Sequence, residues 1–176
     1  MSRHAPEAVE KLASRSLAAG LAMLAFSVVG AFFDLDQFFR SYLLAYVFWL
    51  GVALGCLAIV MIQHITGGAW GAVIRRLLEA GARTIPVMGL LFVPLAFGLK
   101  SLYPWARPDL VAADELLQHK QAYLNVTFFL LRALVYFAAW SALAWRLSRM
   151  SGEQDRTGDE RLIRRFVLVS AGGLLV

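Results

Sequence analysis

Apolar residues in this chain come in long blocks that no charged side chain interrupts. The stretch from Leu17 to Phe33 has no charged residue, and neither has the longer stretch from Tyr42 to Gln63. A helix needs about 20 mostly apolar residues, and at least about 17, to cross the hydrocarbon core of a bilayer. Blocks of this kind disfavour a soluble α/β or all-β domain, whose strands are short or alternate in polarity. They predict a helical integral membrane protein.

The composition excludes three other classes of protein. Hydrophobic residues make up 60% of the 176 residues and charged residues only 16%, whereas soluble domains have about 25% charged residues. The apolar content excludes a disordered chain, and the single cysteine, Cys56, excludes a disulfide-stapled secreted domain. The net charge of +5 does not indicate nucleic-acid binding, because the basic residues flank the apolar blocks.

The blocks predict four complete transmembrane helices and the start of a fifth. The predicted spans are residues 17–33, 42–63, 85–103, 122–145 and 166–176. The last span is apolar to its end but covers only about half a crossing. An apolar helix ending in mid-bilayer would leave its last carbonyls without hydrogen bonds. We therefore expect residues 1–176 to form a single membrane domain that is the N-terminal part of a longer chain.

The basic residues predict the orientation of these spans. Of the 17 Lys and Arg residues, twelve lie in residues 1–16, 64–84 and 146–165, and four lie in residues 34–41 and 100–121. Loops rich in Lys and Arg stay in the cytoplasm. The N-terminus is therefore predicted to be cytoplasmic, in a multi-pass protein of the plasma membrane.

The segment after the second span has an amphipathic pattern. Arg75, Glu79 and Arg83 follow one another at i, i+4 spacing along one side of a helix. The apolar positions share the other side: Val73, Ile74, Leu77 and Leu78. This pattern predicts a helix lying in the membrane interface, with its charged side toward water.

Arg132 is the only charged residue inside the fourth predicted span. It lies about 15 Å along the helix from Ala122, which is near the middle of the membrane. A central arginine is costly unless it faces a partner group, the bundle interior or water. No Asp or Glu lies in the four complete spans. The counter-group is expected in the missing C-terminal part, in a partner subunit or on a ligand; the alternative is a shifted helix whose Arg132 reaches the outer surface.

The positions of the histidines and of the cysteine do not indicate a metal site. Two axial haem ligands should lie at similar depth, but His64 is expected at the inner end of one span and His119 at the outer end of another, about 30 Å apart. One cysteine cannot hold an iron–sulfur cluster. His64 is interpreted as a polar residue at a helix end, with a proton-path or ligand contact as the alternative.

Several motifs together resemble one family. They are the run His64-Ile-Thr-Gly-Gly-Ala-Trp-Gly with Arg75, Arg76, Glu79 and Arg83-Thr84, then Leu102-Tyr103-Pro104-Trp105-Ala106, then His119-Lys120 with Ala122-Tyr123-Leu124-Asn125, and finally Arg132 with Tyr136-Phe137. Over roughly residues 40–150 the chain resembles the F-type membrane subunit of bacterial alternative complex III, which is related to the polysulfide-reductase (NrfD-like) membrane subunits. Members of that family are about twice as long, with ten spans.

The resemblance implies a bacterial inner-membrane subunit of a respiratory quinol:electron-acceptor oxidoreductase. Such a subunit binds no redox cofactor itself and is not expected to be catalytic alone. Its partners would be other membrane subunits, a multihaem cytochrome and an iron–sulfur subunit, which hold the haem and the clusters. The resemblance implies a role in quinone handling, in proton translocation or in both, with Arg132, Tyr136 and His64 as the candidate residues.

Two alternatives of other classes remain open. An intramembrane arginine could bind an anionic substrate in a secondary transporter, and Pro94 could break a helix as such folds require. The chain could also be a purely structural membrane scaffold in which Arg132 pairs with a neighbour for assembly.

Overall fold

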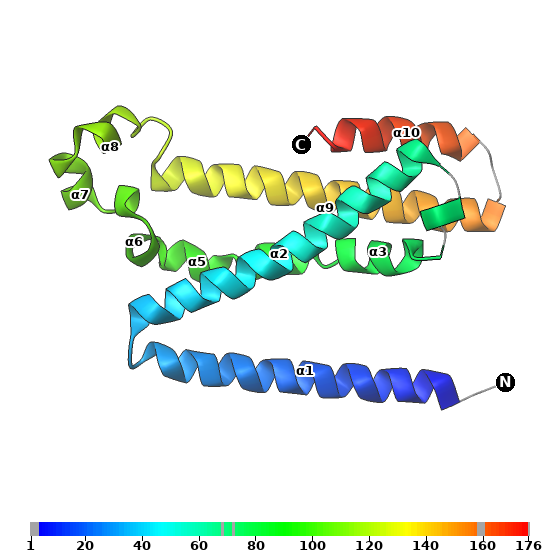
Figure 1. The fold of residues 1–176 in the computed structure, drawn as a ribbon, viewed down its shortest axis with the longest axis horizontal. Helices are drawn as coiled ribbons and strands as arrows, with labels where there is room; N and C mark the ends of the chain where they lie inside the picture. The colour runs from blue at the N-terminus through cyan, green and yellow to red at the C-terminus, as the bar shows by residue number, and fades with distance from the viewer. Residues whose placement is uncertain (1–3, 68, 72, 158–160, 176) are drawn as a thin grey trace. The chain divides into compact units, whose positions relative to one another are not determined.

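The computed structural model describes residues 4–67, 69–71, 73–157 and 161–175, and the regular structure within these ranges is helical (Figure 1). The chain divides into two compact units, residues 1–42 and residues 43–176. In the described ranges, four helical stretches are long and apolar enough to cross a membrane: Val9–Ala31, Leu35–Thr66, Arg75–Phe97 and Val126–Arg156. The prediction of an all-α membrane helix bundle is confirmed.

The first unit contains α1 (His4–Ala31) and the first turns of α2 (Leu35–Thr66). Asp34 begins α2, because its Oδ1 accepts a hydrogen bond of 2.9 Å from the backbone N–H of Gln37. A carboxylate at this position satisfies a free donor of the first turn and suits the positive end of the helix dipole. Large apolar side chains of α1 are exposed within the unit, among them Phe26 at 82%. Such a surface suits contact with lipid.

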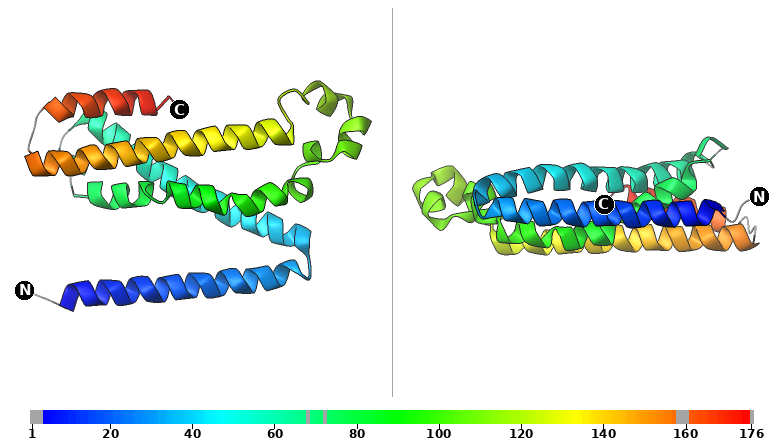
Figure 2. Two further views of the ribbon diagram at one scale, coloured as in Figure 1. Left: turned by 180° about the vertical axis from the view of Figure 1, so that it is seen from behind. Right: turned by 90° about the horizontal axis from the view of Figure 1, so that it is seen from below.

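The second unit is arranged around α9 (Val126–Thr157). The helix α10 (Arg161–Gly173) packs on it, and so do α3 (Arg75–Ala82) and α4 (Ile85–Leu91), which continues into α5 (Val93–Phe97). Figure 1 shows α9 between α10 and the α3–α5 stretch, with α2 crossing it obliquely, and Figure 2 shows the same elements from two further sides.

The apolar core lies where α2, α3, α4, α9 and α10 meet. Its buried residues are Ala53, Leu57, Val60, Met61, Ala82, Ile85, Ala144, Leu147, Leu162 and Phe166. Glycine allows α3 to approach α2 closely, because a Cβ on Gly81 would lie 2.6 Å from the Sγ of Cys56. Close backbone approach at small residues is how membrane helices gain packing contacts.

Two prolines divide the third span into short helices. Pro86 lies in the first turn of α4 and Pro94 in the first turn of α5, where the missing N–H of proline costs little. At the first break, the Thr84 hydroxyl donates a hydrogen bond of 2.7 Å to the carbonyl of Gly81. The same carbonyl also accepts the backbone N–H of Thr84 at 3.1 Å, so two hydrogen bonds from Thr84 close the turn before α4.

The connections also contain short helices. They are η1 (Ala69–Gly71), α6 (Leu99–Leu102), η2 (Pro104–Ala106), α7 (Pro108–Ala113) and α8 (Glu115–His119). Asp114 begins α8 by accepting hydrogen bonds from the backbone N–H groups of Leu116 and Leu117. The predicted outer loop, residues 100–121, is therefore folded.

The helices differ in extent from the predicted spans, most instructively at the third and the fourth span. The fourth span was expected from Ala122 to Trp145, but α9 begins at Val126 because Asn125 Oδ1 accepts a hydrogen bond of 2.8 Å from the Phe128 N–H. At its other end α9 continues to Thr157, since polar residues extend the helix beyond the apolar block. The third span was expected from residue 85, whereas the apolar helical stretch begins at Arg75.

Part of the charged side of α3, at Arg75 and Glu79, faces the protein. Glu79 is 5% exposed, while Leu77, on the opposite side, is 73% exposed. The interfacial amphipathic helix predicted for residues 71–83 placed its charged side toward water. The structure differs from this expectation at Arg75 and Glu79, because Asp155 on α9 offers a partner to Arg75, and at Leu78, which packs against the core.

Candidate functional site

An aromatic cavity in the second unit brings together two of the three predicted site residues, Arg132 and Tyr136. The cavity has a volume of about 210 Å³ and lies between α2, the end of α4 and α9. Its lining residues are Tyr46, Leu50, Phe92, Phe129, Arg132, Ala133, Tyr136, Phe137 and Trp140. Such a cavity can hold a flat apolar ring.

Ring contacts between the helices hold the walls of this cavity. Phe92 is central, because its ring centroid lies 6.1 Å from that of Tyr46, 6.0 Å from that of Phe129 and 5.8 Å from that of Phe137. On α9, the rings of Tyr136 and Trp140 are stacked at 5.5 Å. The hydroxyl of Tyr46 donates a hydrogen bond of 3.1 Å to the Met88 carbonyl, which ties α2 to α4.

Arg132 places its charge against aromatic rings. Its guanidinium carbon lies 3.9 Å from the ring centroid of Tyr123 and 4.9 Å from that of Phe128. Cation–π contacts of this kind stabilise a cation by about 0.5–2 kcal/mol, depending on how far it is removed from water. Because α9 begins at Val126, Arg132 lies about 9 Å along the helix and not about 15 Å. Side chains of a helix point toward its N-terminus, so the guanidinium reaches back to the residues before and at the helix start.

His64 lies apart from this cavity, near the other end of α2. Its Nδ1 is 3.2 Å from the hydroxyl oxygen of Ser170 on α10, and its ring centroid is 4.3 Å from that of Phe166. Its Nε2 is buried and has no hydrogen-bond partner among the described residues. His64 therefore offers a buried nitrogen that can accept or donate a proton.

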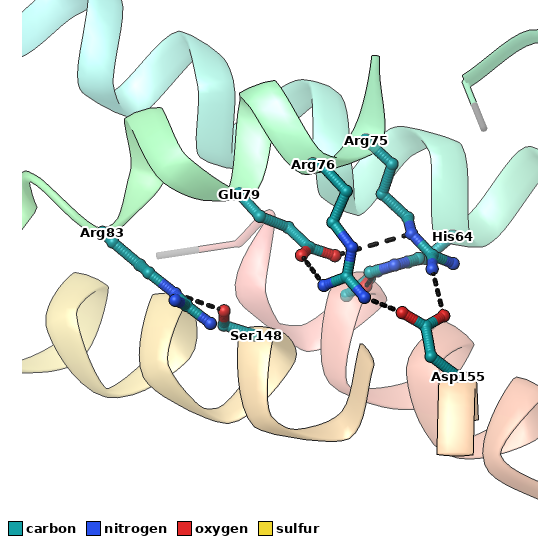
Figure 3. A network of polar contacts seen from close by, with 8 residues as sticks. His64, Arg75, Arg76, Glu79, Arg83, Ser148 and Asp155 are labelled. Carbon is teal, nitrogen blue, oxygen red and sulfur yellow. Dashed lines mark hydrogen bonds and ion pairs between the residues drawn. The ribbon is translucent and has the colours of Figure 1, made fainter. Parts of the chain in front are cut away.

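Next to His64, an ion-pair network joins α3 to α9 (Figure 3). Arg75 Nη2 lies 2.7 Å from Asp155 Oδ1 and its Nε lies 3.6 Å from Glu79 Oε1. Arg76 Nη1 lies 2.9 Å from Glu79 Oε2, and its Nη2 contacts Asp155 Oδ2. Each arginine thus bridges the same two carboxylates, of which Glu79 is buried.

This network was not predicted from the sequence, because the predicted interfacial helix has Glu79 on its solvated side and no partner in Asp155. The i, i+3 and i, i+4 spacing of Arg75, Arg76 and Glu79 was a signal for mutual pairing. The partner across the bundle had no local signal, because Asp155 follows Arg75 by 80 residues.

No group of three or more His, Cys, Asp or Glu side chains that could hold a metal ion occurs in the described part of the chain. The sequence matches no known protein-family profile and no curated protein sequence.

Proposed function

We propose that this chain is a cofactor-free membrane subunit of a bacterial respiratory quinol:electron-acceptor oxidoreductase, of the alternative complex III kind. In this proposal the aromatic cavity receives the quinone ring, and the haem and iron–sulfur clusters belong to partner subunits. The motifs that resemble the F-type subunit support the family, and the cavity that joins Arg132 and Tyr136 supports the role.

The cavity has the aromatic walls on which a quinone ring can stack. A quinone is a flat ring that stacks on aromatic side chains, and its two carbonyl oxygens accept hydrogen bonds. Tyr136 and Arg132 line the cavity through apolar atoms, and the Arg132 guanidinium lies against Tyr123 and Phe128. In the proposal, the Tyr136 hydroxyl turns toward a bound ring and donates a hydrogen bond to one of its oxygens. A cavity of about 210 Å³ suits the ring alone, so the apolar tail would extend into the lipid.

Quinol oxidation also releases protons, and His64 is the candidate residue for passing them. Its buried Nε2 has no described partner, and its Nδ1 is already placed by Ser170. Histidines in chains of polar groups are typical of proton paths in membrane proteins. We propose that the end of the bundle around His64 faces the cytoplasm, as the distribution of basic residues predicts.

The test uses membranes that contain the complete protein with its native partners. A photoreactive quinone analogue should label the peptide around Tyr136, and excess unmodified quinone should prevent the labelling. Tyr136→Phe removes one hydrogen-bond donor, which is typically worth about 1 kcal/mol, so the quinone should bind roughly fivefold more weakly. Arg132→Leu should lower quinol oxidation per assembled complex.

Tyr103→Phe is the matched control, because it removes a tyrosine hydroxyl outside the cavity. It should leave both labelling and turnover unchanged. Labelling that excess quinone does not prevent would refute the proposed site. If Arg132→Leu lowered only the yield of complex and not its turnover, the scaffold alternative would hold in place of a quinone-handling role.

One observation favours a secondary transporter as the second candidate. The third span is interrupted at Pro86 and at Pro94, and transporter folds use interrupted helices to build substrate sites. Uptake of an anionic substrate by vesicles containing only the purified protein would support this function. Such uptake would not be expected of an oxidoreductase subunit.

A further inference from the structure

A second cavity lies between the start of α4 and the distal half of α9, away from the aromatic cavity. Its volume is about 440 Å³, and its lining combines two arginines and two serines with three apolar residues. The lining residues are Arg83, Pro86, Ser141, Ala144, Trp145, Ser148 and Arg149. None of the residues proposed above for quinone or proton handling takes part in it.

Arg83 is held in place at the wall of this cavity. Its Nε donates a hydrogen bond of 2.6 Å to the hydroxyl oxygen of Ser148, which is buried on α9 (Figure 3). Because the Nε–H is engaged, the terminal Nη groups are the donors that Arg83 can offer to a ligand. A guanidinium with a fixed plane binds two oxygens of one phosphate group at once.

Arg149 adds a second positive charge beside an aromatic ring. Its guanidinium carbon lies 5.4 Å from the ring centroid of Trp145, and Trp145 itself is 63% exposed. An exposed tryptophan in a membrane helix is typical of the headgroup region, where its ring contacts both acyl chains and polar groups. The cavity therefore has a charged part and a part that suits a lipid environment.

No acidic residue is among the described residues that line this cavity. Glu79 lies one turn before Arg83, but its carboxylate is bound by Arg75 and Arg76. Glu153 lies one turn after Arg149 and does not line the cavity. The two charged side chains on the described wall of the cavity, Arg83 and Arg149, are thus both positive.

We propose that this cavity binds a phosphate-bearing anion through Arg83 and Arg149, with the Ser141 and Ser148 hydroxyls as further hydrogen-bond groups. The headgroup of an anionic phospholipid is the favoured source, because the exposed ring of Trp145 lies beside the charges. Basic cavities between membrane helices bind such headgroups in general. The site is independent of the quinone cavity and would persist in a transporter or a scaffold.

The test compares two sources of phosphate with the full-length protein in detergent. In the first arm, native mass spectrometry measures how much phosphatidylglycerol and how much phosphatidylcholine the protein retains. In the second arm, inorganic phosphate is titrated while tryptophan fluorescence is recorded, with Trp145→Phe identifying the contribution of Trp145. The double variant Arg83→Gln/Arg149→Gln is measured beside the wild type in both arms.

Arg164→Gln/Arg165→Gln is the matched control, because it removes two exposed arginines of α10 that do not line the cavity. The wild type and the control should retain phosphatidylglycerol in preference to phosphatidylcholine. The cavity variant should bind it roughly tenfold to thirtyfold more weakly, since each basic residue near a lipid surface contributes about 1 kcal/mol. Thermal unfolding of both variants shows whether the fold is kept, and Arg83→Lys/Arg149→Lys should recover part of the binding.

Each outcome has a definite meaning. Saturable binding of inorganic phosphate that the cavity variant loses supports the site with free phosphate as its source. Loss of phosphatidylglycerol alone supports the lipid headgroup. Equal retention by wild type and a folded cavity variant, or equal loss in the α10 control, overturns the proposal.

Discussion

Glu79 and Asp155 bind the same two arginines but differ in their distance from solvent. Glu79 is 5% exposed, whereas the Asp155 side chain is 38% exposed. The charge of Glu79 is therefore less screened, and water cannot replace the hydrogen bonds that its carboxylate loses. Variants of these two residues therefore show how burial changes the loss of stability when one carboxylate is removed from the same network.

We predict that Glu79→Gln lowers the stability of the protein more than Asp155→Asn does. Glutamine keeps the shape of the side chain but not the charge, and it leaves two arginines with one fewer carboxylate. Loss of a buried charged partner of this kind costs about 1–3 kcal/mol. Thermal unfolding of the purified protein in detergent measures both variants, and a larger loss in Asp155→Asn would contradict the expected order.

At the scale of helices, two glycines can be compared. Gly81 lies where two helices are in close contact, and Gly51 lies in open space. A Cβ on Gly81 would lie 2.6 Å from Cys56 Sγ, whereas a Cβ on Gly51 would have no described atom within 4 Å. We predict that Gly81→Ala destabilises the bundle by about 1–3 kcal/mol, because α3 must move away from α2. Gly51→Ala should be neutral or stabilising, since alanine favours a helix.

The same unfolding experiment measures this pair of variants. Equal melting temperatures for Gly81→Ala and the wild type would show that α2 and α3 are not in close contact. A partial rescue is also expected, because Cys56→Ala removes Sγ and leaves only Cβ, at 3.1 Å from the new methyl group.

The sequence predicted where the helices lie better than it predicted which side of α3 faces the protein. Apolar blocks identify spans because the bilayer sets the length of an apolar helix. Helix ends depend on caps such as Asn125, which has little signal beyond one polar residue. The side of α3 that faces inward depends on Asp155 and Ser148, which lie far along the chain. For this reason the pattern of Arg75, Glu79 and Arg83 was assigned to water.

The candidate site was likewise predictable from the sequence only in part. Arg132 and Tyr136 are one helical turn apart, so their shared place on α9 could be predicted from spacing. The cavity between them also needs Tyr46 and Phe92 from other helices, and no local pattern relates these residues to α9. The cation–π contact between Arg132 and Tyr123 was not predicted, because Tyr123 precedes the start of α9 and has no helical spacing to Arg132.

At the scale of the whole molecule, the structure brings the end of α9 next to the start of α3, as the orientation of the spans requires. Both segments were predicted to lie in the cytoplasm because they are rich in arginine. The contact between Arg75 and Asp155 places them at one end of the second unit. The side of the membrane that this end faces stays a prediction.

We predict that cysteines introduced at opposite ends of α9 differ in their accessibility. In a Cys56→Ala background, Gln121→Cys should react in intact cells with a membrane-impermeant maleimide. Glu153→Cys should react only after the membrane is permeabilised, because positively charged loops stay inside. The parent without cysteine controls for background labelling, and the reverse pattern would show that the orientation is inverted.

The ion pairs between α3 and α9 can form only after both segments have been synthesised. Arg75 leaves the ribosome 80 residues before Asp155, so two guanidinium groups reach the membrane with half of their carboxylates still unmade. Until Asp155 is made, Arg75 and Arg76 share Glu79 alone, so the link between α3 and α9 forms only after most of the described chain has been synthesised.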